Sequence, residues 1–140
     1  MRQPHDESGA EVNDLEQELS SLRSELSELR WRRLVAQTDP YGADEIKLVE
    51  HLSDGVSEQI ALNKHRRGLP TVNPEVQSGV GVDLLERIDA EGLPLSHDLA
   101  LLIIQDEIDR SIAVQNEFRA ELVVDGIGSL GVDAQVDALE

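Results

Sequence analysis

The sequence predicts a single domain of the all-α class. The chain has 140 residues, which is enough for one hydrophobic core. Its only aromatic residues are Trp31, Tyr41 and Phe118, so the core must consist of aliphatic side chains, as is typical of small helical proteins. Apolar residues recur at helical spacing along stretches that end at proline or glycine. These three observations together favour packed helices over a β-sandwich.

The first predicted helix covers residues 13–37. Residues 1–12 show no hydrophobic periodicity, and we interpret them as a disordered leader. The helix carries an a/d heptad stripe of leucines spaced alternately four and three residues apart. The stripe consists of Leu15, Leu19, Leu22, Leu26 and Leu29. Because so short a coiled coil is marginal by itself, the segment must pack on its own chain or on a partner.

A turn at residues 38–42 separates the first helix from the second. The turn reads Thr-Asp-Pro-Tyr-Gly, in which the proline removes a backbone donor and the glycine loosens the chain. The second helix is predicted at residues 43–67 and ends at Gly68, with Pro70 following. Its apolar positions are Ile46, Leu48, Val49, Leu52, Val56, Ile60 and Leu62.

Two more helices complete the predicted helical domain at residues 38–123. Asn73-Pro74 is able to start a helix, and the apolar spacing places the third helix at about residues 82–90. Ser96 is expected to cap a last long helix that runs to about residue 123, followed by an acidic tail at 124–140. The predicted apolar face of the last helix is Leu99, Leu102, Ile103, Ile112, Ala113 and Phe118.

The charge balance excludes several classes of function. Twenty-nine acidic residues against 12 basic ones give a net charge of −17, which disfavours binding to nucleic acid and to anionic membranes. No apolar run approaches the roughly 18 residues that span a bilayer, and the acidic N-terminus does not resemble a signal peptide. We therefore expect a cytoplasmic protein without nucleic-acid or membrane partners. The excess of carboxylates indicates either salt adaptation (a halophilic source) or solubility alone.

No pattern of metal ligands or nucleophiles is present. The chain has no cysteine and its histidines are scattered, so no metal site is predicted. Ser96, His97 and Asp98 are adjacent and suit a helix cap better than a hydrolase triad. The segment Lys64–Arg67 concentrates three cations in an acidic chain. It either offsets a helix dipole or forms an anion pocket.

The segment from Lys64 to Pro74 resembles the first helix junction of the all-helical chorismate mutases. It reads Lys-His-Arg-Arg-Gly-Leu-Pro-Thr-Val-Asn-Pro, and residues 84–88 and 102–115 are similar to runs in that family's second and third helices. The resemblance covers roughly residues 43–118. It implies a three-helix protomer in an intertwined homodimer, with the heptad helix as an addition. It also implies that chorismate is rearranged to prephenate without metal or cofactor.

The same resemblance implies the site residues. Lys64 would donate to the ether oxygen of chorismate, and Gln77 stands where the family has a glutamate. The catalytic residues would be Lys64, Gln115 and Gln77. The substrate-binding residues would be Arg23, Asn73, Ser111 and Arg67, with Arg23 reaching into the partner's site.

The chain departs from the family at two arginines that hold the substrate's carboxylates. Val76 and Ser53 stand at these positions, so Arg33, Arg66 or Arg67 would have to substitute. Two hypotheses follow. The chain is a chorismate mutase of aromatic amino acid biosynthesis, or it is a catalytically inactive helical dimer with a structural, regulatory or partner-binding role.

Overall fold

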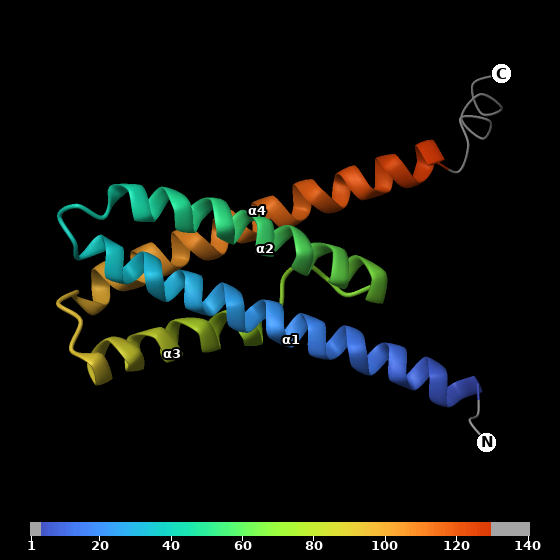
Figure 1. The fold of residues 1–140 in the computed structure, drawn as a ribbon, viewed down its shortest axis with the longest axis horizontal. Helices are drawn as coiled ribbons and strands as arrows, with labels where there is room; N and C mark the ends of the chain where they lie inside the picture. The colour runs from blue at the N-terminus through green and yellow to red at the C-terminus, as the bar shows by residue number, and fades with distance from the viewer. Residues whose placement is uncertain (1–3, 130–140) are drawn as a thin grey trace.

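The computed structural model describes residues 4–129, which form four helices and contain no strand. The helices are α1 (Pro4–Gln37), α2 (Ala43–Arg67), α3 (Pro74–Glu91) and α4 (His97–Ser129). Figure 1 shows that successive helices run in opposite directions, and that α1 begins and α4 ends at the same end of the molecule. The prediction of an all-α protein is confirmed.

Two glycines make the sharp turns at the ends of α2 possible. A Cβ atom on Gly42 would lie 2.1 Å from the carbonyl oxygen of Ala36, so only glycine fits this turn. The carboxylate of Asp39 accepts a hydrogen bond of 2.9 Å from the backbone N–H of Tyr41 and so stabilises the turn. Gly68 has a φ of 66°, the left-handed conformation that commonly ends a helix. The chain therefore reverses before α2 and leaves the helix abruptly after it.

The leucine stripe of α1 packs against α2 of the same chain. Its most buried members form one hydrophobic cluster with apolar residues of α2. The buried residues of this cluster are Leu19, Leu26, Leu29, Val49, Val56 and Ile60. The heptad segment therefore packs within the protomer, where Leu19, Leu26 and Leu29 are buried against α2.

A second hydrophobic cluster joins the end of α1 to α3 and α4. It consists of Trp31, Leu34, Leu84, Ile88, Ala100, Ile103, Ile104 and Ile108. The predicted burial of Leu99 and Leu102 is wrong, because these side chains are 45% and 70% exposed. Residues 99–104 are all apolar, so the periodicity of the sequence does not single out one face of the helix there.

Helix boundaries differ from the prediction at three places. Residues 4–12, predicted as a disordered leader, belong to α1, because proline suits the first helical position and extending an existing helix costs little. α3 begins at Pro74 rather than 82, since the Asn73 side chain caps it by accepting a hydrogen bond from the Val76 N–H at 3.4 Å. α4 continues to Ser129, past residue 123. The rest of the predicted tail, residues 130–140, lies outside the described residues.

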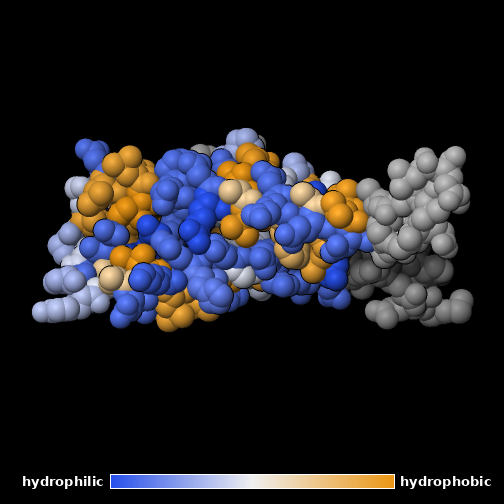
Figure 2. Space-filling model, turned by 90° about the horizontal axis from the view of Figure 1, so that it is seen from above, coloured by the Kyte–Doolittle hydropathy of each residue, from blue (hydrophilic) through white to orange (hydrophobic). Residues whose placement is uncertain are grey.

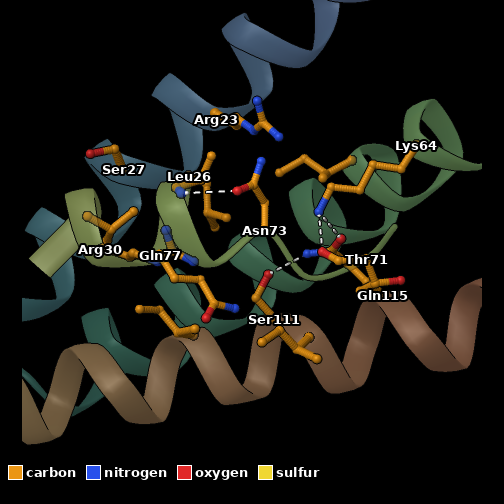
Figure 3. A pocket seen from close by; sticks show the side chains of 15 residues that line it. Arg23, Leu26, Ser27, Arg30, Lys64, Thr71, Asn73, Gln77, Ser111 and Gln115 are labelled. Carbon is orange, nitrogen blue, oxygen red and sulfur yellow. Dashed lines mark hydrogen bonds between the residues drawn. The ribbon is translucent and has the colours of Figure 1, made fainter. Parts of the chain in front are cut away.

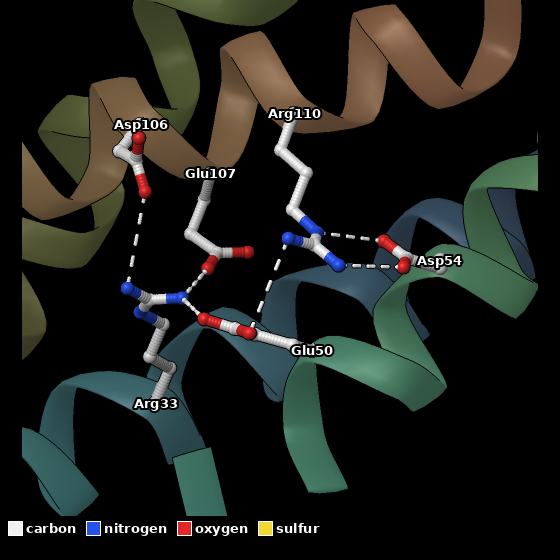
Figure 4. Close-up of polar contacts among 6 residues, drawn as sticks. All are labelled: Arg33, Glu50, Asp54, Asp106, Glu107 and Arg110. Carbon is white, nitrogen blue, oxygen red and sulfur yellow. Dashed lines mark hydrogen bonds and ion pairs between the residues drawn. The ribbon is translucent and has the colours of Figure 1, made fainter. Parts of the chain in front are cut away.

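Ion pairs connect α1, α2 and α4 (Figure 4). Arg33 of α1 donates hydrogen bonds to Glu50 of α2 and to Glu107 of α4. Arg110 donates to both carboxylate oxygens of Asp54, at 2.9 and 2.7 Å. Glu107 is only 4% exposed, and this burial raises the pKa of its carboxyl while Arg33 opposes the change. We call these five residues the ion-pair cluster.

The surface is mostly hydrophilic. Figure 2 shows hydrophilic side chains over much of the face seen from above, with separate hydrophobic patches between them. None of the helices in the described part of the chain is long and apolar enough to cross a membrane.

Candidate functional site

One pocket lies where the four helices meet (Figure 3). Its cavity volume is about 90 Å³. Each helix contributes side chains that are three, four or seven residues apart, which places them on one face of that helix. Arg23 and Arg30 of α1, for example, are seven apart, and Ser111 and Gln115 of α4 are four apart. The pocket is therefore lined by one face of each helix, with polar and apolar side chains in each lining set.

Six of the seven predicted site residues line this pocket. They are Lys64, Gln115, Gln77, Arg23, Asn73 and Ser111. Arg67 is not among the lining residues, and instead its Nη2 pairs with Glu16 Oε1 of α1 at 3.3 Å. Val76 also lines the pocket, whereas Ser53 is buried outside it with a hydroxyl that finds no partner among the described residues.

Lys64 is the most constrained cation of the pocket. It is only 6% exposed, and its ammonium donates to the Thr71 carbonyl at 2.7 Å and to Gln115 Oε1 at 2.8 Å. An ammonium has three N–H donors, so one remains for a ligand. Burial, with further contributions from the charges of Arg23 and Arg119, lowers the pKa of Lys64 to about 8. Such a cation is held in an environment that favours the arrival of an anion.

A chain of hydrogen bonds orients the Gln115 amide. Its Oε1 faces Lys64, while its Nε2 donates to Ser111 Oγ at 3.1 Å. The Ser111 hydroxyl is also 2.8 Å from the hydroxyl of Ser57, a buried residue of α2. Because each group has a partner on both sides, Gln115 and Lys64 are fixed before any ligand binds.

Two further cations near the pocket were not predicted from the sequence. Arg30 lines the pocket and is 8% exposed, and burial lowers the pKa of its guanidinium. Arg119 donates to the Leu69 carbonyl at 2.7 Å and to Thr71 Oγ1 at 3.1 Å, and so holds the loop before α3. A signal for both exists in the sequence. Arg30 follows Arg23 by seven residues and Arg119 follows Gln115 by four, so each continues a stripe.

The pocket can bind an anion and stabilise negative charge. Arg23, Arg30 and Lys64 are cationic, and no Asp or Glu is among the described residues that line it. In a chain with a net charge of −17, this is a marked local exception. Neutral amides from Gln77 and Gln115 add donors. The described lining has no histidine, so a hydroxyl–imidazole pair for nucleophilic attack is missing from it.

Comparison of the chain with models of protein families, with curated proteins and with solved structures finds no match.

Proposed function

We propose that the chain is a chorismate mutase, which rearranges chorismate to prephenate. The observation that carries the proposal is the buried ammonium of Lys64, oriented by Gln115 in a pocket whose described lining has no carboxylate. Chorismate has two carboxylates and an ether oxygen that accepts hydrogen bonds. A cationic pocket with neutral amide donors suits such a dianion.

The chemistry of the rearrangement matches what the pocket offers. The reaction is intramolecular and requires no nucleophile and no proton transfer, so catalysis reduces to holding the reactive conformer and stabilising charge as the ether bond breaks. Lys64 would donate its remaining N–H to the ether oxygen, with Gln77 as a second donor. Arg23 would hold a carboxylate. This role does not require the intertwined dimer that the resemblance implies, since Arg23 and Lys64 of one chain line the same pocket.

Direct assay of the purified protein tests the proposal. Chorismate is followed by its loss of absorbance, in low salt and in multi-molar salt, because so acidic a chain can require salt to screen its own charges. We expect turnover above the uncatalysed rate in at least one condition. If neither condition gives turnover, the chain is not a chorismate mutase, and a non-catalytic role becomes the better hypothesis.

The pH dependence of kcat/KM should report the titration of Lys64. Its pKa is about 8 in the free protein, so the ammonium predominates below pH 8 and is lost above it. We expect kcat/KM to fall about tenfold per pH unit above pH 8. A bound dianion favours the ammonium and raises its pKa, so kcat should persist to higher pH.

The same lowered pKa of Lys64 makes the stability of the fold rise with pH, whereas kcat/KM falls. The folded state loses the Lys64 proton before the unfolded chain does, so the contribution of Lys64 to stability rises with pH between about 8 and 10.5. Thermal unfolding measured beside the kinetics therefore separates loss of activity from loss of structure. A kcat/KM that stays constant to pH 10 would contradict the assignment of Lys64.

A further inference from the structure

For the proposed substrate, the residues predicted from the sequence supply too few cations to the pocket. The substrate would bring two carboxylates, but the positions from which the resemblance leads one to expect two arginines hold Val76 and Ser53. Of the predicted cations, only Arg23 and Lys64 line the pocket, and Lys64 is assigned to the ether oxygen. A further cation must therefore bind the second carboxylate.

Arg30 is a buried guanidinium that lines the pocket, and its Nε has no hydrogen-bond partner among the described residues. Among the side chains that the structure describes, none forms a hydrogen bond or ion pair with Arg30, and its Nε is fully enclosed without an acceptor. A buried charge without a partner is costly, so proteins rarely keep one unless a ligand supplies the partner. In Figure 3, Arg30 and Lys64 lie on opposite sides of the pocket.

The neighbouring carboxylate of Glu107 does not occupy the N–H donors of Arg30. Glu107 is close enough to influence the charge of Arg30, but its carboxylate oxygen accepts a hydrogen bond from Arg33. Glu107 thus offsets part of the cost of burying Arg30 without occupying its N–H donors. These donors form a planar fork that matches the two oxygens of a carboxylate.

We propose that Arg30 binds one carboxylate of the substrate, and that it does so in the same chain that supplies Lys64. The inference rests on the proposed function. The turn at residues 38–42 folds α1 back onto α2, which brings Arg30 and Lys64 to one pocket within a single protomer. One chain then holds a complete site, and no residue of a second copy is needed.

The first test replaces Arg30 with Gln and uses Arg32→Gln as its matched control. Arg32 is on the same helix, is 43% exposed and pairs with Glu45 away from the pocket. We expect Arg30→Gln to lower kcat/KM for chorismate at least about 30-fold, mainly through KM. Arg32→Gln should stay within about twofold of the wild type. Arg30→Lys should recover only part of the loss, because the ammonium keeps the positive charge but lacks the planar fork of donors.

The outcomes separate this inference from the function on which it rests. If the wild type turns over chorismate and Arg30→Gln does so equally well, Arg30 does not bind the substrate, although the proposed function stands. If thermal unfolding shows that Arg30→Gln has lost its structure, the KM of Arg30→Lys is compared with that of the wild type instead. Equal KM values would refute the binding of a substrate carboxylate by Arg30. A wild type without turnover overturns both proposals.

The second test asks whether one chain is enough. Arg30→Gln and Lys64→Ala chains are unfolded together, refolded as a mixture and assayed. A site within one protomer predicts no activity beyond the sum of the two variants, because every site retains one defect. Recovery of activity in the mixture would show that Arg30 and Lys64 act across two chains, and would overturn this part of the proposal.

Discussion

Replacing Lys64 with Ala is expected to lower kcat for chorismate by at least about 10²–10³-fold, the usual cost of removing one donor to a developing negative charge. The ammonium is pre-aimed by the Thr71 carbonyl and Gln115, so no other side chain takes its place at the ether oxygen. The measurement is the initial rate of chorismate loss at saturating substrate and at a pH below 8.

The fold should survive this substitution. The Lys64 ammonium is buried and repelled by Arg23 and Arg119, so its charge opposes folding. Arg119 still holds the loop through Leu69 and Thr71. We therefore expect an unchanged helical circular dichroism spectrum and a midpoint of thermal unfolding close to that of the wild type.

Arg66→Ala is the matched control for Lys64→Ala. It removes a cation two residues away that is exposed at the end of the same helix. We expect its kcat to remain within about twofold of the wild type, because screened surface charges contribute little. A Lys64→Ala variant that retains wild-type kcat would show that the site is not organised around this ammonium.

Replacing Arg33 with Met is expected to cost about 3–5 kcal/mol of stability at pH 7, the range for breaking a buried ion pair. Arg33 donates to Glu107, which is 4% exposed, and also to Glu50. Without Arg33 the Glu107 carboxylate would lose its hydrogen-bond donor, and its pKa, already raised by burial, would rise further. Urea unfolding at pH 7 measures the loss.

The sign of the pH dependence provides a second check on this variant. A carboxyl with a higher pKa in the folded state binds a proton more readily when folded, so its penalty fades as the pH falls toward that pKa. Stability of Arg33→Met should therefore recover in mild acid relative to the wild type at the same pH.

Two controls isolate the buried pair. Arg32→Met breaks the neighbouring ion pair between Arg32 and Glu45, whose two side chains are 43% and 42% exposed. It should cost no more than about 1 kcal/mol of stability. The double variant Arg33→Met/Glu107→Leu removes both charges and should be more stable than Arg33→Met alone. Equal losses from Arg32→Met and Arg33→Met would show that burial does not strengthen the ion-pair cluster.

Much of the fold follows from local sequence. The bounds of α2 match the prediction of residues 43–67, because Gly42 and Gly68 are turn signals that act within a few residues. The leucine spacing likewise predicts the buried stripe of α1. Residues 4–12 and 124–129 carry no apolar stripe that would predict a helix. They are helical as the extensions of α1 and α4.

The site was predictable only in part. The resemblance to the all-helical chorismate mutases names Lys64, Ser111 and Gln115, and these three line one pocket. Arg67 is near Lys64 in sequence, yet it lies outside the pocket and pairs with Glu16. Arg30 was missed because three arginines near the end of α1 look alike in the sequence. Arg30 lines the pocket, Arg32 is exposed, and Arg33 joins the ion-pair cluster.

The sequence by itself determined that this protein is helical and where its chain turns. These properties depend on backbone propensity and on spacing along one helix, which are local. Only the tertiary structure decided that α1 packs on α2 of its own chain and that Arg30 reaches the pocket. The reason is that burial and charge pairing depend on which faces of different helices meet, and that is decided by contacts between residues far apart in the chain.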